Sequence, residues 1–448
     1  MKTTPDIHVG ILQAKKIRFE LSGKFTSATS LRPIQGAFEA RLAEGSIHVY
    51  QDGVTLGSRE EFIFYPSQAG EATFVIRDVV IGIGFHWEQK EDQAFQGALK
   101  LLILEGTIQV VNVVSVETYL ESVISSEMRA DSSPALLRAH TVISRSWLLA
   151  QIHKQESLAR EQTAYSLVHE DEHSYIRWYD REDHRLFHVC ADDHCQRYQG
   201  ITRAHNPAVV EAVRSTRGEV LMYGQAICDA RFSKCCGGVS EVFEACWEPV
   251  RHGYLQRIDD NPADRPVNTA DLRVEETADA FIRSSPEAFC NTRDGRLLSQ
   301  VLNDYDQSSP DFYRWELEYT QDEISALIRE KSGRDFGDIL DLVPVERGES
   351  GRLIRLKIVG SKQTLTVGKE LEIRRWLSKS HLYSSAFVVT PLDRNGGIPA
   401  RFHFRGAGWG HGVGLCQIGA AVMADRGYNH QDILTHYFKG ARLEKHYD

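Results

Sequence analysis

Hydrophobic and polar residues alternate in short runs near the start of the chain. Strand-like runs cover residues 7–12, 16–21 and 46–50, and glycines separate these runs from one another. Alternation between turn residues is typical of β-strands that bury one face. The pattern therefore predicts a β-rich N-terminal lobe over residues 1–109.

After residue 115 the apolar spacing changes to a helical period. Apolar residues at 116, 119, 120, 123 and 124 predict a helix that ends near Glu127. Residues 131–133 are N-cap candidates, and Pro134 suits the first turn of a second helix that we expect to reach about Lys154. Glu127 thus lies at a break between two helices, with Arg145 of the second helix able to fold back toward it. On position alone, Glu127 is either a catalytic acid or a solvated residue at a helix end.

The remainder of the chain predicts mixed secondary structure. Residues 256–385 are more charged and less regular, with a predicted helix at 321–329 and a predicted strand at 353–359. We expect an inserted α+β subdomain there, flanked by the two parts of a core at 110–255 and 386–448. The predicted fold class is α+β: a β-rich N-terminal lobe, a helix pair that carries Glu127, and a mixed α/β core with the insert.

Charge and hydropathy narrow the range of partners. The net charge of −10 over 448 residues argues against non-specific binding to nucleic acid or to anionic membranes. No apolar run is long enough to predict a transmembrane helix. The N-terminus, Met1 to Asp6, has no hydrophobic signal core, so we expect either a cytoplasmic protein or an export segment that lies outside this sequence.

The cysteines are clustered. Six of the eight lie between residues 190 and 246, and Cys190 and Cys195 have histidines close by. Two thiolates, His194 and either His184 or His188 would complete a closed tetrahedral zinc site, which is structural because no position is left for water or substrate. The alternatives are a reduced cysteine pair in a core and a local disulfide.

The other cysteines of this region have no histidine among them. We expect them to be small buried residues: Cys228, Cys235, Cys236 and Cys246.

A glycine-rich motif follows at residues 404–420. Five glycines alternate with single residues from 406 to 414, which lets the chain approach a ligand or another backbone closely. The motif lacks the Gly-Lys-Ser/Thr ending of a phosphate-binding loop. It leads into a predicted helix that begins near Leu415 and has Gln417 in its first turn. His411, presented between glycines, suits hydrogen bonding in a cleft; the alternative is a tight β-bulge beneath the core.

Taken together, three motifs resemble the stage II sporulation protein D family (SpoIID/LytB), which also includes amidase-enhancer proteins. Residues 116–128 are similar to the family's V-E-x-Y-L…E-M, and residues 137–146 to its A-x-A-V-x-A-R-T/S. Residues 408–414 are similar to its G-x-G-W-G-H-G-V-G-M-S-Q-x-G-A, with Leu415-Cys416 here in place of Met-Ser. The motifs lie in the family's order and span residues 110–448.

The resemblance implies a lytic transglycosylase that cleaves peptidoglycan strands between N-acetylmuramic acid and N-acetylglucosamine. Glu127 matches the family's catalytic acid, and Arg145 matches its partner arginine. A protonated Glu127 would deliver its proton to the glycosidic oxygen and then take a proton from the C6 hydroxyl, which closes a 1,6-anhydro ring. No water nucleophile is required, so one carboxylate is enough. We assign Arg145 to positioning of the substrate or intermediate.

One stretch departs from the family pattern. The family's Y-F-H-S-T-S-G-G appears here as residues 231–238, where Arg231 and Ser233 replace the tyrosine and histidine that help line the cleft. We expect these two residues to bind substrate together with Trp409, His411 and Gln417. Residues 184–200 resemble the corresponding segment of zinc-bearing members, which supports a structural Zn²⁺ ion.

Two classes of function follow from the resemblance. The first is an enzyme whose partners are peptidoglycan glycan strands. The second is a non-catalytic wall-binding protein that enhances a separate N-acetylmuramoyl-L-alanine amidase, which the altered 231–233 stretch permits. Either class implies a place in the cell envelope or periplasm. A cytoplasmic sugar-binding protein is a third possibility, but it gives no role to the three motifs.

Overall fold

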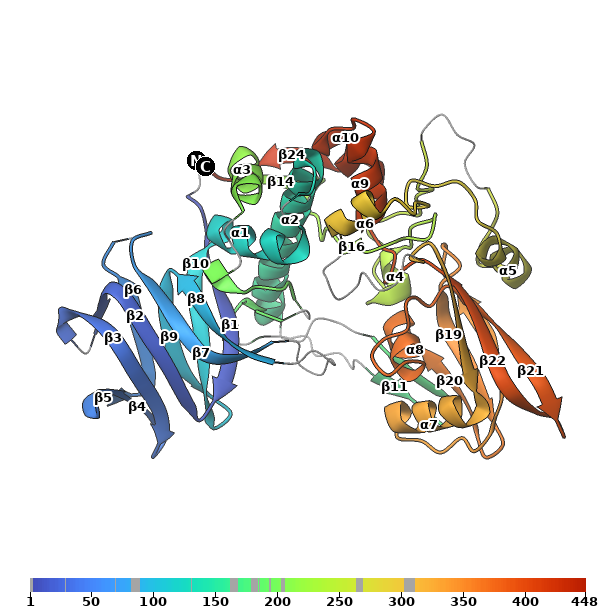
Figure 1. Cartoon of the computed structure of the whole chain (residues 1–448), viewed down its shortest axis with the longest axis horizontal. Coiled ribbons are helices and arrows are strands. Elements are labelled where there is room, and N and C mark those ends of the chain that lie inside the picture. Colours follow the sequence, from blue (N-terminus) through green and yellow to red (C-terminus); the bar gives the residue numbers. More distant parts are fainter. Residues whose placement is uncertain are drawn as a thin grey trace. The chain divides into compact units, whose positions relative to one another are not determined.

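The protein has a mixed α+β fold, as predicted. The computed structural model describes residues 3–28, 30–68, 70–81, 89–129, 131–161, 168–178, 184, 186–192, 195–202, 206–262, 269–301 and 311–448. The chain forms two compact units, one of residues 1–156, 183–220 and 444–448, and one of residues 157–182 and 221–443. Figure 1 shows the elements of both units.

The first unit is built on a large, mostly antiparallel sheet. Its strands are β1 (Asp6–Ala14), β2 (Lys16–Ser27), β3 (Ser30–Ala43), β4 (Ser46–Gln51), β5 (Val54–Arg59), β6 (Glu61–Pro66), β7 (Thr73–Ile81), β8 (Gln89–Gln96), β9 (Ala98–Leu104), β10 (Thr107–Ser115) and β13 (Val189–Cys190). The sheet order is β13-β1-β10-β9-β6-β2-β3-β4-β5, and β7 pairs with β2 and β8. The predicted strands at 7–12, 16–21 and 46–50 are confirmed as β1, β2 and β4.

The alternation of buried and exposed side chains along each strand explains how this sheet forms its core. Phe19 of β2, Val49 of β4 and Phe64 of β6 are buried, while the residues beside them in sequence are more exposed. The sheet thus buries one set of side chains from strand to strand, as the period of two requires. The adjacent β10 is buried on both faces along most of its length, and α1 packs against it.

Three helices belong to the first unit wholly or in large part. They are α1 (Val116–Glu127), α2 (Pro134–Glu161) and α3 (Pro207–Ser215), and a 3₁₀ turn lies at Gly200–Thr202. Strand β10 leads directly into α1, and Figure 1 shows the helices gathered at that end of the sheet. The predicted helix pair is confirmed. The second helix is longer than expected and begins where Ser133 Oγ accepts the Leu136 N–H over 3.3 Å.

The second unit contains several smaller sheets. A five-stranded sheet has the order β11 (Val168–Glu170), β12 (Ser174–Arg177), β20 (Thr364–Gly368), β19 (Leu353–Gly360) and β18 (Ile339–Arg347), and a three-stranded sheet has the order β17 (Arg314–Thr320), β22 (Ile398–Ala407) and β21 (Phe387–Asn395). Strands β16 (Phe232–Ser233) and β23 (Leu415–Cys416) pair in parallel. The strands β14 (Glu219–Tyr223), β15 (Ala226–Ile227) and β24 (Arg442–Lys445) form a further sheet.

Seven helices are described in the second unit. They are α4 (Phe243–Cys246), α5 (Glu275–Arg283), α6 (Gly295–Val301), α7 (Gln321–Ser332), α8 (Glu370–Trp376), α9 (Gln417–Asp425) and α10 (His430–Tyr437). The predicted helix at 321–329 is α7: Thr320 and Glu323 form a capping box, and Gly333 ends the helix in the left-handed conformation. The predicted strand at 353–359 is β19. Helices α7 and α8 share a buried core with these sheets that includes Trp315, Trp376 and Phe404.

None of the helices in the described part of the chain combines the length and the apolarity needed to cross a membrane.

Candidate functional site

Glu127 is the last residue of α1. The helix begins after Ser115, whose Oγ accepts the Thr118 N–H over 3.2 Å, and ends where the Met128 N–H donates to the Ile124 carbonyl over 2.9 Å. The Glu127 side chain is half-buried. The unpaired carbonyls of a helix C-terminus carry partial negative charge and disfavour a carboxylate anion there. The location of Glu127 therefore suits an acid that must hold its proton.

Two serines precede Glu127 and present unused hydroxyl groups. The Oγ atoms of Ser125 and Ser126 are buried, and neither has a hydrogen-bond partner among the described residues. A buried hydroxyl without a partner is costly, and in native proteins it usually has a role or binds water. Beside a candidate acid, these hydroxyls offer hydrogen-bonding positions for a polar ligand.

Arg145 is fully buried and pairs with Glu117. Its Nε and Nη2 atoms donate to the two Glu117 carboxylate oxygens over 3.1 and 2.7 Å. Its remaining donors reach the carbonyls of Glu219, over 3.1 Å, and Val213, over 3.5 Å. Glu117 in turn accepts from the Gly218 N–H over 3.3 Å and from the Tyr447 hydroxyl over 2.5 Å.

This arrangement differs from the expected one, in which Arg145 folds back toward Glu127. Among the described residues, Arg145 forms no ion pair or hydrogen bond with Glu127, and both charges of the Arg145–Glu117 pair lie away from solvent. The pair joins the first turn of α1 to the middle of α2. A buried ion pair whose hydrogen bonds are all made holds its two partners in one geometry, although burying the charges costs desolvation energy. Arg145 therefore fixes the position of α1, the helix that carries Glu127.

The segment that follows the predicted zinc site packs on α1. The Tyr119 hydroxyl donates to Gln196 Oε1 over 3.2 Å, and the Gln199 N–H donates to Ser122 Oγ over 3.0 Å. The rings of Tyr119 and Tyr198 stack with their centroids 5.0 Å apart. Glu117 faces Arg145 on one side of α1, and residues 196–199 pack against the other side.

Three of the predicted zinc ligands lie together. The ligand atoms of His184, Cys190 and Cys195 are all within 4.8 Å of one another, and His184 Nε2 lies 3.5 Å from Cys195 Sγ. These residues could hold a metal ion. The fourth predicted ligand, His194, lies outside the described residues. His188 is placed elsewhere, because its Nδ1 accepts the His8 N–H over 3.2 Å and its ring stacks on that of His8.

In the second unit, the glycine-rich loop of residues 406–414 is hydrogen-bonded through its backbone to residues 231–236. Cys235 and Trp409 exchange backbone hydrogen bonds of 3.0 and 2.8 Å, and the Leu415 N–H donates to the Arg231 carbonyl over 3.0 Å. Gly414 has a φ of +73°, and a Cβ there would lie 2.1 Å from the Arg231 carbonyl oxygen. The glycines therefore permit direct backbone contact between the two loops. The loop is thus packed tightly against residues 231–236, and His411 within it is half-buried.

His411 is held as a neutral ring. Its Nδ1 accepts the Val413 N–H over 3.0 Å, so the proton of the neutral ring lies on Nε2. Burial and the nearby guanidinium groups of Arg231, Arg374 and Arg352 hold the pKa of His411 well below its usual range. The ring meets Trp247 edge-on, with centroids 4.7 Å apart.

Arg231 shares the Trp247 surface with His411. Its guanidinium lies 4.4 Å from the centre of a Trp247 ring and forms an ion pair with Asp229, with Nε 2.6 Å from Oδ1. The replacement for the family's tyrosine is thus a fixed cation on an aromatic surface.

The other predicted binding residues surround the same loop pair. Ser233 is buried, and its Oγ has no hydrogen-bond partner in the described part of the chain. Trp409 is half-buried between Phe312 and Tyr383, with ring centroids 4.7 and 4.3 Å away. Gln417 is the first residue of α9, in the first turn as predicted, and its side chain is buried. The structure therefore brings all five predicted binding residues to one loop pair, while Glu127 belongs to the first unit.

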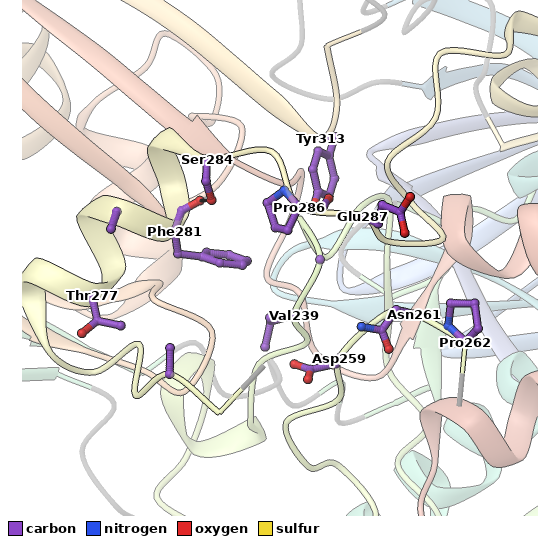
Figure 2. A pocket seen from close by; sticks show the side chains of 13 residues that line it. Val239, Asp259, Asn261, Pro262, Thr277, Phe281, Ser284, Pro286, Glu287 and Tyr313 are labelled. Carbon is purple, nitrogen blue, oxygen red and sulfur yellow. Dashed lines mark hydrogen bonds between the residues drawn. The ribbon is translucent and has the colours of Figure 1, made fainter. Parts of the chain in front are cut away.

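Two features of the second unit were not predicted from the sequence. One is a pocket of about 510 Å³ lined by residues that include Val239, Asp259, Phe281, Glu287 and Tyr313 (Figure 2). The other is a buried cluster of three cysteines and an aspartate. Cys228, Cys235, Cys236 and Cys246 are all buried, as expected. Cys236, however, contacts cysteines far away in sequence, which local spacing cannot reveal.

Comparison with known proteins assigns families to two parts of the chain. Residues 104–223 match the family model described as Stage II sporulation protein, and residues 241–414 match a domain of unknown function (DUF8618). The chain is 23% identical to stage II sporulation protein D of Bacillus amyloliquefaciens over 333 residues, which cover 74% of this chain and 75% of that protein. It is 22% identical to stage II sporulation protein D of Bacillus subtilis over 339 residues, or 75% of this chain and 76% of that protein.

These matches support the resemblance read from the motifs: residues 104–223 are similar to the stage II sporulation protein D family. The matched segment 104–223 contains α1, α2 and the cysteine–histidine segment. The similarity to these proteins suggests a peptidoglycan-related role.

Proposed function

We propose that the protein is a peptidoglycan lytic transglycosylase with Glu127 as its general acid and base. The observation that carries the proposal is the place of Glu127, half-buried at the C-terminus of α1 within the family-matched segment. The field of the helix end favours the protonated carboxylic acid. Arg145 does not oppose this state, because Glu117 neutralises its charge.

The reaction needs one carboxyl group in two successive roles. Glu127 donates its proton to the oxygen of the glycosidic bond as positive charge develops on the sugar ring, and the bond to N-acetylglucosamine breaks. The Glu127 carboxylate then accepts the proton of the C6 hydroxyl of N-acetylmuramic acid, whose oxygen attacks C1 and closes the 1,6-anhydro ring. The carboxyl group returns to its starting state, and no water is consumed.

Arg145 acts as a positioning residue in this mechanism. Its buried pair with Glu117 fixes the start of α1, and therefore the direction in which the end of α1 presents Glu127. The unpaired hydroxyls of Ser125 and Ser126 supply hydrogen bonds to the sugar.

We propose that the loop pair of the second unit recognises the glycan strand. Ser233 offers an unused hydroxyl, and Arg231 offers a fixed cation suited to a lactyl or peptide carboxylate. His411 supports this surface as a neutral ring whose hydrogen bonds go to the backbone of Val413 and Phe232. Trp409 provides half-exposed aromatic surface against which a sugar ring can pack.

A zinc ion would be held by His184, Cys190 and Cys195, with His194 as the proposed fourth ligand. The fit rests on the three ligand atoms lying within 4.8 Å of one another. Such an ion supplies no reaction chemistry, because a closed site has no open position. It cross-links residues 184–195, and residues 196–199 beyond them hold α1.

The proposal is tested with purified protein and stem-peptide-free glycan strands. Mass spectrometry should find anhydro-muramyl products with wild type and not with Glu127→Gln. Glu121→Gln removes a half-buried carboxyl from the same helix and serves as the matched control. Equal yields from Glu127→Gln and wild type would reject the catalytic role.

The same experiment distinguishes the second function, a wall-binding enhancer of an amidase. The change at residues 231 and 233 favours it, because the family's tyrosine and histidine are absent there. An enhancer would release no sugar products alone, but would bind strands and increase stem-peptide release by an added amidase, and Glu127→Gln would retain both effects.

A further inference from the structure

Four buried side chains from separate parts of the second unit converge on one point. Cys236, Asp260, Cys290 and Cys416 are each at most 2% exposed, and their ligand atoms all lie within 4.8 Å of one another. They come from the segment after β16, from the 259–261 segment, from the segment before α6, and from β23. The cluster is separate from the His184, Cys190 and Cys195 group, which belongs to the first unit.

The spacing of the sulfur atoms matches a mononuclear metal site. Zinc–thiolate bonds of about 2.3 Å place two sulfurs of a tetrahedron ~3.8 Å apart. Cys236 Sγ and Cys290 Sγ are 3.5 Å apart, which is close to this edge and well beyond the ~2.05 Å of a disulfide bond. Three thiols and one carboxylate supply the four ligands of a closed site.

Neighbouring donors already favour the anionic forms of two ligands. Cys416 Sγ accepts the N–H groups of Cys236, over 3.2 Å, and of Gly419, over 3.5 Å, at the N-terminus of α9. Asp260 accepts the Cys290 N–H over 2.9 Å and the Tyr437 hydroxyl over 2.6 Å. Donors of this kind orient metal ligands and stabilise them as anions.

Among the residues that the structure describes, no lysine or arginine forms an ion pair with Asp260. In the described ranges, the basic group that pairs with Asp260 is His436, whose Nε2 lies 3.9 Å from Oδ1. A fully buried carboxylate with no cation is strongly unfavourable. A divalent ion at the centre of the cluster would supply the missing positive charge.

We propose that Cys236, Asp260, Cys290 and Cys416 bind one zinc ion in a closed, structural site. Sulfur-rich tetrahedral ligand sets favour zinc over the harder divalent cations. The site needs no open position, because no ligand atom faces solvent.

The ion would also fix the walls of the pocket in Figure 2. Three of its ligands lie within three residues of lining residues: Cys236 near Gly238, Asp260 between Asp259 and Asn261, and Cys290 near Glu287. The Asp260 N–H donates to the Gly238 carbonyl over 2.9 Å, and the Phe289 N–H donates to the Asp260 carbonyl over 2.5 Å. The four-ligand site would thus connect three of the segments that line the pocket.

Metal analysis of the full-length protein tests the site independently of glycan cleavage. On a Cys190→Ser/Cys195→Ser background, which removes the first cluster, the protein should retain about one equivalent of zinc. Adding Cys290→Ser should remove it, while Cys228→Ser, a buried cysteine outside both clusters, should not. Equal zinc in the Cys290→Ser and Cys228→Ser proteins would overturn the proposal.

A second measurement needs no variant of the new site, in case Cys290→Ser does not fold. The cobalt-loaded Cys190→Ser/Cys195→Ser protein should show thiolate-to-cobalt charge-transfer absorption, and Cys236, Cys290 and Cys416 should resist alkylation until a chelator is added. Absence of the absorption, or a Cys236–Cys290 disulfide in peptide maps of protein that holds no metal, would overturn the site.

Discussion

The Arg145 guanidinium donates to both carboxylate oxygens of Glu117, in a pair that is almost completely removed from solvent. The pair connects the two helices on either side of the break at which Glu127 lies. The arginine that the family resemblance paired with the catalytic acid is therefore bound to a different acid, ten residues earlier in the same helix. In the proposed mechanism, Arg145 acts by fixing the position of α1.

Breaking this pair should destabilise the protein. Arg145→Met leaves the Glu117 carboxylate buried without its cation, which typically costs about 3–5 kcal/mol. Arg138→Met, which removes a half-buried arginine of the same helix whose charge has no buried partner acid among the described residues, should cost under about 1 kcal/mol. Urea denaturation measures both, and equal stabilities of the two variants would contradict a structural role for the pair.

Removing an unpaired hydroxyl beside Glu127 should weaken glycan binding without lowering the stability of the fold. Ser126→Ala deletes a buried Oγ that has no partner among the described residues, so the free energy of unfolding should change by less than about 1 kcal/mol. If that hydroxyl binds the glycan, KM for strands should rise. Ser122→Ala is the matched control, because its Oγ accepts the Gln199 N–H and its loss should lower stability. An unchanged KM in Ser126→Ala would remove the hydroxyl from the site.

The glycine at the contact between the two loops should be irreplaceable. Gly414→Ala places a Cβ 2.1 Å from the Arg231 carbonyl oxygen in a left-handed conformation, which should cost roughly 2–5 kcal/mol. Gly396→Ala also has a positive φ, but its surroundings are open, so it should cost only about 1–2 kcal/mol. Thermal unfolding distinguishes the two, and equal shifts in Tm would argue against the close contact.

The pH dependence of stability should reveal the neutral His411. Its pKa in the folded protein lies below the unfolded value of 6.5, so the unfolded chain binds the proton first on acidification. Stability is therefore lost as the pH falls below about 6.5. His411→Asn should lose less stability over this range than wild type, as measured by urea denaturation at a series of pH values. Parallel curves for the two proteins would mean that His411 titrates normally.

Much of the secondary structure could be predicted from the local pattern of apolar and polar residues. The alternation of β1, β2 and β4 and the helical period of α1 are visible in the sequence because each element buries one face. The partner of Arg145 was not predictable in the same way, since Glu117 and Glu127 both lie on α1, and only the helix rotation decides which one faces α2. The resemblance assigned Arg231, Ser233 and His411 to one binding site, and in the structure they lie on two loops that are hydrogen-bonded to each other.

The buried cluster of Cys236, Asp260, Cys290 and Cys416 could not be predicted from local sequence spacing. Cys290 lies 54 residues from Cys236, and Cys416 lies 180 residues from it. No spacing rule joins ligands at these separations, because they meet only through the tertiary fold. Residues 184–195, by contrast, carry cysteines and histidines close together in sequence, so a metal site is predictable there from local spacing.

The central claim is that Glu127 breaks glycan strands without water. Digestion of stem-peptide-free strands in heavy-oxygen water, followed by mass spectrometry of the new chain ends, tests it most directly. The account predicts 1,6-anhydro ends without the heavy isotope from wild type, and no new ends from Glu127→Gln. Heavy oxygen at the new reducing ends of the wild-type products, or anhydro ends formed equally well by Glu127→Gln, would contradict it.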